Sequence, residues 1–142
     1  MKKYIIDTNA LISFVTDRNP DQQEIIADLF EQAAQIKVFL FVHQHTLTEF
    51  IFVMEKVYSI PKKEIARMVS DLIAMPGIEV VSPIDYSLVL SWWPESVPDF
   101  GDAVIASICK NIKGSIVVTF DRKFMERLKA LKLNFQTFQK TV

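Results

Sequence analysis

The chain has 142 residues, of which 50% are hydrophobic and 23% are charged. These values fit one soluble domain of ordinary size that buries a hydrophobic core. Sixteen Lys and Arg residues stand against 17 Asp and Glu residues, so the net charge is -1. This balance excludes a global attraction to nucleic acids or to acidic membranes, and any polyanion must be bound by a local patch.

The chain shows no sign of export. Its single cysteine, Cys109, cannot form an internal disulfide or a zinc cluster, and its apolar neighbours predict a buried thiol. The start "MKKYII" is basic and then apolar, but Asp7 ends the apolar stretch well short of the roughly 7 to 15 residues that a signal peptide needs. No apolar run approaches the roughly 18 residues of a membrane span. We therefore expect a cytoplasmic protein in a reducing compartment, without a membrane segment.

Strands and helices are predicted to alternate along the chain. Short apolar runs predict strands over residues 4–6, 37–42, 78–81 and 115–120, and a short edge strand over 134–138. Apolar residues at helical spacing predict helices over residues 10–15, 21–35, 46–58, 61–75, 85–93, 99–112 and 121–131. This alternation predicts a three-layer α/β/α fold around a parallel sheet. No repeat or linker interrupts it, so we expect residues 1–142 to form one domain.

Two carboxylates follow predicted strands. Asp7 ends the first strand, and Asp121 comes closely after "IVVTF". In an open parallel sheet, ligands bind just beyond the carboxyl ends of the strands, so both acids are candidates for a site at this edge. The alternative is that each acid caps the helix that follows it.

Two further acids lie at positions where folding alone gives no clear reason for a carboxylate. Glu49 lies in "TLTEFIFVM", where apolar residues occupy most of the helix surface, so an ionised carboxylate is costly there unless a cation or hydrogen bonds compensate for it. Otherwise Glu49 reaches past the apolar rim into water. Asp102 begins the helix before the fourth strand, three residues after Asp99. The structural alternative is that Asp99 caps this helix and Asp102 complements its positive end.

Four acids at one edge predict a bound cation. Asp7, Glu49, Asp102 and Asp121 would raise one another's pKa by charge repulsion, and a hard cation would remove that penalty. Carboxylates are the ligands that Mg²⁺ and Mn²⁺ prefer. One such ion, or two, can activate water and stabilise charge on a phosphate, which predicts hydrolysis of a phosphodiester.

The segments "IIDTNALISF", "TLTEF", "DFGDAVIASI" and "VVTFDRKF" together resemble the PIN-domain family of metal-dependent ribonucleases. In size and layout the chain is similar to the VapC-type toxins of bacterial toxin–antitoxin pairs. The resemblance covers nearly the whole chain, in the same order, with all four acids present. It implies a five-stranded parallel sheet with an acidic pocket at its carboxyl edge, a homodimer, and an antitoxin that lies over the active-site groove.

The resemblance also implies roles for individual residues. The metal-binding, catalytic carboxylates would be Asp7, Glu49, Asp102 and Asp121. Beside them, Thr8, Asn9 and Thr119 match polar positions that orient an acid or a water, and Asp99 matches an accessory position. The implied reaction is attack of a metal-activated water on a backbone phosphate of single-stranded RNA, without a covalent enzyme intermediate.

Basic and aromatic residues supply candidates for holding RNA. Arg122 and Lys123 directly follow Asp121 and form a possible phosphate track. Trp92 and Trp93 are stacking candidates, but adjacent tryptophans near a helix end favour a core or subunit-interface role. The two histidines of "HQHT", His43 and His45, do not share a helix face and are interpreted as surface or helix-start residues rather than metal ligands.

Three other functions compete with a toxin nuclease. A phosphatase of the haloacid dehalogenase type also begins with a strand ending in Asp, but it needs a second Asp two residues later, where this chain has Asn9. A non-catalytic PIN scaffold typically lacks one or more of the acids, and here none is missing. A PIN nuclease that processes RNA without an antitoxin has the same sequence features as a toxin, and the RNA target is not encoded in any motif.

Overall fold

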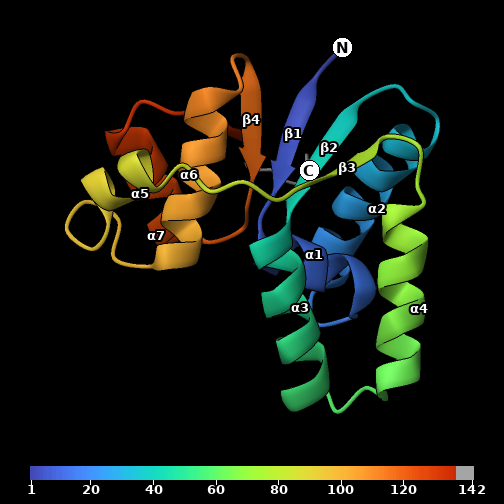
Figure 1. The fold of residues 1–142 in the computed structure, drawn as a ribbon. Coiled ribbons are helices and arrows are strands. Elements are labelled where there is room, and N and C mark those ends of the chain that lie inside the picture. The colour runs from blue at the N-terminus through green and yellow to red at the C-terminus, as the bar shows by residue number, and fades with distance from the viewer. Residues whose placement is uncertain (137–142) are drawn as a thin grey trace.

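The computed structural model describes residues 1–136 of the chain (Figure 1). The strands are β1 (Lys3–Ile6), β2 (Phe39–His43), β3 (Ile78–Val81), β4 (Ser115–Val118) and β5 (Phe135–Gln136). The helices are α1 (Thr8–Val15), α2 (Pro20–Ala34), α3 (Gln44–Lys56), α4 (Lys62–Ile73), α5 (Tyr86–Trp92), α6 (Phe100–Asn111) and α7 (Arg122–Ala130). None of these helices is long and apolar enough to cross a membrane.

The five strands form one parallel sheet with the order β3-β2-β1-β4-β5. From the central β1 the chain builds outward to β2 and β3, then returns to the other side of β1 to form β4 and β5. The strand order therefore reverses between β1 and β4, and ligands in such sheets bind beyond the carboxyl ends at the reversal. Asp7 and Asp121 follow these two strands, so the topology brings the first two candidate acids to one edge.

Helices cover both faces of the sheet. Figure 1 shows α1 to α4 on one side and α5 to α7 on the other. Because side chains of a strand point alternately to the two faces, β1 contributes to both cores. Tyr4 and Ile6 pack in the cluster with α1 to α4, whereas Ile5 packs in the cluster with α6 and α7. The predicted three-layer α/β/α fold with a parallel sheet is confirmed.

Side-chain caps move some helix starts away from the predicted positions. Helix α1 begins at Thr8 rather than residue 10, because the Asp7 carboxylate accepts a hydrogen bond from the first backbone N–H. Helix α3 begins at Gln44 rather than residue 46, because His43 Nδ1 accepts from the backbone N–H of His45. Pro61, predicted in the first turn of a helix, occupies the cap position just before α4.

The strand boundaries also differ in detail. The predicted fourth strand, 115–120, ends at Val118, because Thr119 and the backbone of Phe120 form hydrogen bonds with residues after β1 instead of continuing the ladder. The second strand covers Phe39–His43 rather than 37–42. Of the predicted edge strand over 134–138, Phe135–Gln136 forms β5, and 137–138 lie outside the described residues.

Candidate active site

Asp7 is the most buried of the candidate acids, with 7% of its surface exposed. Thr119 Oγ1 donates a hydrogen bond to Asp7 Oδ2 over 2.7 Å, and the backbone N–H of Thr8 donates to Oδ1 over 2.8 Å. Burial raises the pKa of Asp7 to about 6 against the opposing effect of both hydrogen bonds, and the charges of Glu49 and Asp121 add a smaller increase. The protein therefore holds this carboxylate where its charge is costly.

Thr119 and Asn9 connect the ends of β1 and β4. Thr119 has one hydroxyl proton, which the short contact assigns to Asp7, and its oxygen accepts from the backbone N–H of Asp121 over 3.1 Å. Asn9 Oδ1 accepts from the backbone N–H of Phe120 over 3.2 Å. Both predicted polar residues thus lie beside the acids and fix the positions of the segments that carry them.

Glu49 reaches this edge from α3. Its Oε1 accepts a hydrogen bond from the Thr8 hydroxyl over 3.2 Å and lies 3.1 Å from His45 Nε2. The Glu49 side chain is 42% exposed and its carboxylate has polar partners, which agrees with the alternative that Glu49 reaches past the apolar rim into water. Gly101 of α6 packs directly against it: a Cβ atom there would lie 2.9 Å from Glu49 Oε1 and 3.2 Å from Asp99 Oδ1.

Among the candidate acids, Asp102 shows the largest increase in pKa. Its carboxylate makes no hydrogen bond or ion pair with any of the described residues 1–136, and only its backbone N–H has a partner, the Asp99 side chain at 2.9 Å. Burial raises the pKa of Asp102 to about 8, followed by the charges of Asp7, Asp99, Asp121 and Glu49. The four other acids therefore lie close enough to Asp102 for their charges to act on its carboxylate.

Capping explains part of this arrangement. Asp7, Asp99 and Asp121 each accept backbone hydrogen bonds at the start of α1, α6 and α7, as the structural alternative predicts. Hydrogen bonds to backbone N–H groups lower the pKa of a carboxyl group, yet the pKa of Asp7 is raised. Asp102 caps nothing with its side chain. Capping alone therefore does not account for the acids at this edge.

The donor set suits a hard divalent cation. Asp7, Glu49, Asp102 and Asp121 offer only carboxylate oxygens, the ligand type that Mg²⁺ and Mn²⁺ prefer, and no thiolate lies among them. Within residues 1–136 no three His, Cys, Asp or Glu side chains are already close enough together to form a ligand cluster. Binding of an ion by these acids would therefore require side-chain rotations that bring their carboxylates closer together.

The sequence matches a family model described as the PIN domain over residues 4–130. The chain belongs to the PIN domain family. The matched segment runs from β1 to the last residue of α7 and so contains all the candidate acids. The resemblance inferred from the motifs is confirmed for the family. No curated protein matches the sequence.

Several solved structures share the fold. One is VapBC2 from Rickettsia felis bound to a DNA fragment from its promoter, with a TM-score of 0.66, 14% identity, and coverage of 96% of this chain and 99% of that chain. Another is VapBC-1 from nontypeable Haemophilus influenzae, with a TM-score of 0.65, 21% identity, and coverage of 94% and 96%. The PIN domain endonuclease Utp24 has a TM-score of 0.51 at 20% identity, with coverage of 89% and 77%. At these identities the comparison establishes the PIN fold.

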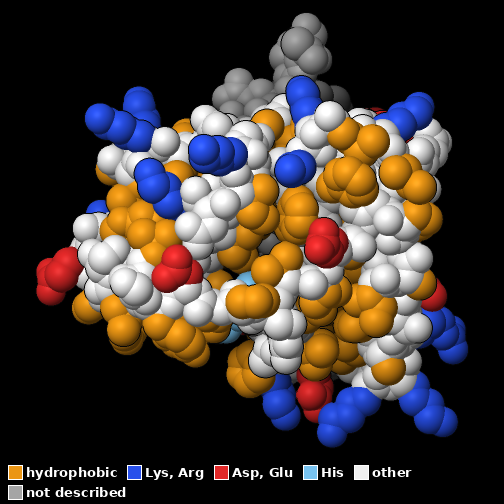
Figure 2. Space-filling view, turned by 45° about the horizontal axis from the view of Figure 1, so that its top comes forward, with side chains coloured by type: hydrophobic (Ala, Val, Ile, Leu, Met, Phe, Trp, Pro, Cys, Tyr) orange, Lys and Arg blue, Asp and Glu red, His pale blue; other side chains and the backbone are white. Residues whose placement is uncertain are grey.

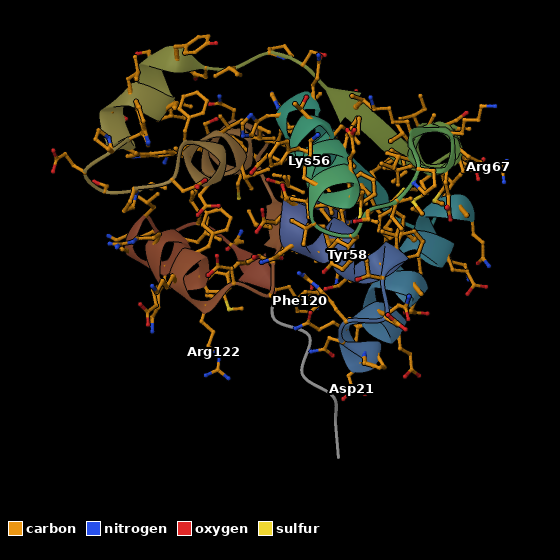
Figure 3. The ribbon with its side chains drawn as sticks, turned by 90° about the horizontal axis from the view of Figure 1, so that it is seen from below. Asp21, Lys56, Tyr58, Arg67, Phe120 and Arg122 are labelled. Atoms are coloured by element: carbon orange, nitrogen blue, oxygen red, sulfur yellow. The ribbon has the colours of Figure 1, made fainter. Side chains whose placement is uncertain are left out.

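The two predicted RNA-binding residues lie differently in this PIN domain. Lys123 lines a pocket of about 240 Å³ together with Asp99, Asp102 and Asp121. Arg122 does not line it, and Figure 3, which looks onto the carboxyl edge of the sheet, shows its side chain pointing away from the body of the molecule. One basic residue that the sequence analysis did not single out, Arg127, does line the pocket.

The histidines of the PIN domain have distinct surroundings. His43 is buried, donates from Nε2 to the Pro83 carbonyl oxygen over 3.0 Å, and connects the end of β2 to the loop after β3. Burial lowers its pKa, and the interpretation as a helix-start residue is confirmed. His45 lies beside Glu49, and the sequence analysis missed this contact although the spacing of four residues on one helix predicts it.

Cys109 and the tryptophans belong to the core that supports the site. Cys109 is buried, as predicted, and its thiol donates to the Ser115 carbonyl oxygen over 3.6 Å. Trp93 donates from Nε1 to the Pro98 carbonyl oxygen over 3.0 Å and contacts the edge of the Phe100 ring. Trp93 therefore fixes the loop that leads into Asp99 at the start of α6.

Positive charge gathers at the opposite edge of the sheet. Lysines precede four of the strands, and all of them are exposed: Lys2, Lys37, Lys113 and Lys132. Figure 2 turns this edge forward and shows Lys and Arg side chains along it. The net charge of -1 therefore conceals an acidic carboxyl edge and a basic amino edge.

Proposed function

We propose that this PIN domain is a metal-dependent endoribonuclease that hydrolyses phosphodiester bonds of single-stranded RNA. The observation that carries the proposal is the Asp102 carboxylate, which has no structural partner among the described residues and whose pKa is raised to about 8 by burial and by four neighbouring acids. A fold does not keep such a group for stability, because its charge costs free energy. PIN domains are generally nucleases, which agrees with this assignment.

In the proposed reaction Asp7, Glu49, Asp102 and Asp121 hold one or two Mg²⁺ or Mn²⁺ ions. A bound cation would lower the pKa of a water molecule and stabilise negative charge on the phosphate. Thr119 keeps the Asp7 carboxylate in one orientation through its 2.7 Å hydrogen bond. Thr8 and His45 hold the Glu49 carboxylate on the side of α6. These contacts reduce the reorganisation that binding and reaction require.

The protein residues offer no competing nucleophile at this edge. The one thiol, that of Cys109 in α6, is buried, and burial raises its pKa, which disfavours the thiolate. Water is therefore the proposed nucleophile, and the chain forms no covalent intermediate. The role of the protein is to position the acids, the phosphate and the water.

We further propose that the protein is the toxin of a VapBC-type pair. In this proposal the chain forms a single domain, assembles as a homodimer and acts in the cytoplasm. The similarity to two VapBC structures supports this proposal at the level of the fold. A groove of about 420 Å³ between α3 and α4 is lined by Ile51, Ile65, Val69 and Ile73 among others, and Ile73 is 50% exposed. An exposed apolar groove of this kind suits the apolar face of a partner helix such as an antitoxin segment.

The test is cleavage of a mixed pool of structured and unstructured RNAs by purified protein. The proposal requires cleavage with Mg²⁺ or Mn²⁺, none with EDTA, and none by Asp7→Asn in the same metals. Failure to cleave any RNA, together with no metal binding by calorimetry, would instead support a non-catalytic PIN scaffold. Cleavage by a protein whose upstream gene encodes no small DNA-binding partner would support an RNA-processing nuclease without an antitoxin.

A further inference from the structure

The pocket beside the acids is lined by both acidic and basic side chains. Its lining comprises Pro98, Asp99 and Asp102 at the start of α6, and Asp121, Lys123, Phe124 and Arg127 at the start and along α7. Lys123 and Arg127 are four residues apart, so both side chains project from the same face of the helix. Phe124 between them is buried in the core, which fixes the rotation of α7 and thereby the direction of this face.

Lys123 and Arg127 form no ion pair with any acid of the described residues, although three carboxylates line the same pocket. Both residues are exposed, so neither side chain is needed for packing. The same pocket is thus lined by acids that can bind a cation and by two basic side chains, without ion pairs among the described residues, that can bind an anion.

A phosphodiester chain that binds together with a divalent cation would match the acidic and basic side chains of this pocket. Once a cation neutralises the acids, the positive charges of Lys123 and Arg127 remain to attract a phosphate. The guanidinium of Arg127 is a planar fork that can donate two parallel hydrogen bonds to one phosphate, whereas Lys123 acts as a point charge. A backbone phosphate has two charged oxygens and can therefore accept hydrogen bonds from both side chains.

We infer that Lys123 and Arg127 bind a backbone phosphate of single-stranded RNA next to the one that is cleaved, and that Arg127 rather than Arg122 is the principal anchor. This inference rests on the proposed ribonuclease function and names how its substrate is held. Arg122 lies one position before Lys123, outside the pocket, and points away from the body of the molecule (Figure 3).

The test measures RNA binding separately from cleavage. A short fluorescein-labelled single-stranded RNA of randomised sequence is titrated with Asp7→Asn protein in Mg²⁺, and its anisotropy is followed over a series of KCl concentrations. Arg127→Gln and Lys123→Gln are added to this background. Arg67→Gln is the matched control, because it removes the same charge from the outer side of α4 (Figure 3).

Arg127→Gln is expected to weaken binding about tenfold or more, and Lys123→Gln somewhat less, because each loses a charged hydrogen bond to phosphate. Each variant should also reduce the salt slope by about 0.7 for the lost single-strand contact. Arg127→Lys should restore only part of the affinity. Equal binding by Arg127→Gln and Arg67→Gln, with unchanged salt slopes, would overturn the inference.

Cleavage assays on the otherwise wild-type chain separate this inference from the proposed function. Full metal-dependent cleavage by Arg127→Gln, with KM and kcat unchanged, would overturn the phosphate anchor and leave the ribonuclease intact. A rise in KM that exceeds the fall in kcat supports the anchor. If the wild-type protein cleaves no RNA, the proposed function fails, and the anisotropy comparison still decides whether α7 binds phosphate.

Discussion

The buried acid at the end of β1 makes the stability of the metal-free protein depend on pH in a specific direction. Burial raises the pKa of Asp7 from its ordinary value of 3.8 to about 6. Below pH 4 the group is protonated in both the folded and the unfolded chain. Between pH 4 and 6 the folded chain keeps the proton that the unfolded chain loses, so the free energy of unfolding falls as pH rises.

The size of this effect follows from the pKa difference. One pKa unit corresponds to about 1.4 kcal/mol, so ionising Asp7 in the folded state costs at most about 3 kcal/mol above pH 6. Asp102, whose pKa is raised to about 8, extends the same decline toward pH 8. Asp7→Asn removes the Asp7 contribution, because an amide has no charge to desolvate.

The assay is urea unfolding in EDTA of the wild type and Asp7→Asn from pH 4 to pH 8. We expect the variant to gain about 2 to 3 kcal/mol relative to the wild type over this range. The hydrogen bond that Asn loses to Thr119 costs the same at each pH, so it does not affect the trend. Glu24→Gln, on the exposed side of α2, is the control and should show no trend. A constant difference between wild type and Asp7→Asn would refute the reasoning.

Three further predictions concern the supports of the site. Gly101→Ala places a methyl group against Glu49 Oε1, the end of a flexible side chain, so we expect stability within about 1 kcal/mol of wild type by urea unfolding and cleavage reduced about tenfold or more. Thr119→Val removes the donor to buried Asp7, should cost about 1 to 3 kcal/mol by urea unfolding, and should raise the pKa of Asp7 further, as read by NMR. Burial lowers the pKa of His43 below 6.5, so the free energy of unfolding of the wild type relative to His43→Gln, by urea unfolding, should fall as pH drops below that value.

The sequence predicted which acids share an edge because strand direction is easy to infer from topology. Asp7 and Asp121 follow buried strands of one parallel sheet. The carboxyl ends of these strands lie at the same edge, independently of how the helices pack. The environment of Glu49 was harder to predict, because its neighbours in the sequence are apolar while its polar partner Thr8 comes from another element. Burial depends on contacts between elements, and those contacts are not encoded in one helix.

The basic residues show a second limit of predicting a site from the local sequence. Because both residues directly follow Asp121, the sequence favoured Arg122 and Lys123 equally. Consecutive residues on a helix are about 100° apart around its axis, so the two side chains of α7 point in different directions. The spacing of four residues places Arg127 on the same face as Lys123, but only the packing of Phe124 into the core shows that this face borders the acidic pocket. His45 could have been identified earlier, because it lies one helical turn before Glu49.

The central claim is that the acidic pocket binds a cation and cleaves RNA, and Asp102 tests it most directly because its side chain supports no other part of the described structure. The measurement is single-stranded RNA cleavage in Mn²⁺ by the wild type and Asp102→Asn at equal concentration. The account predicts cleavage by the wild type and a loss of about a hundredfold or more in the variant, which should be folded and at least as stable without metal. Equal cleavage by both proteins would contradict the account.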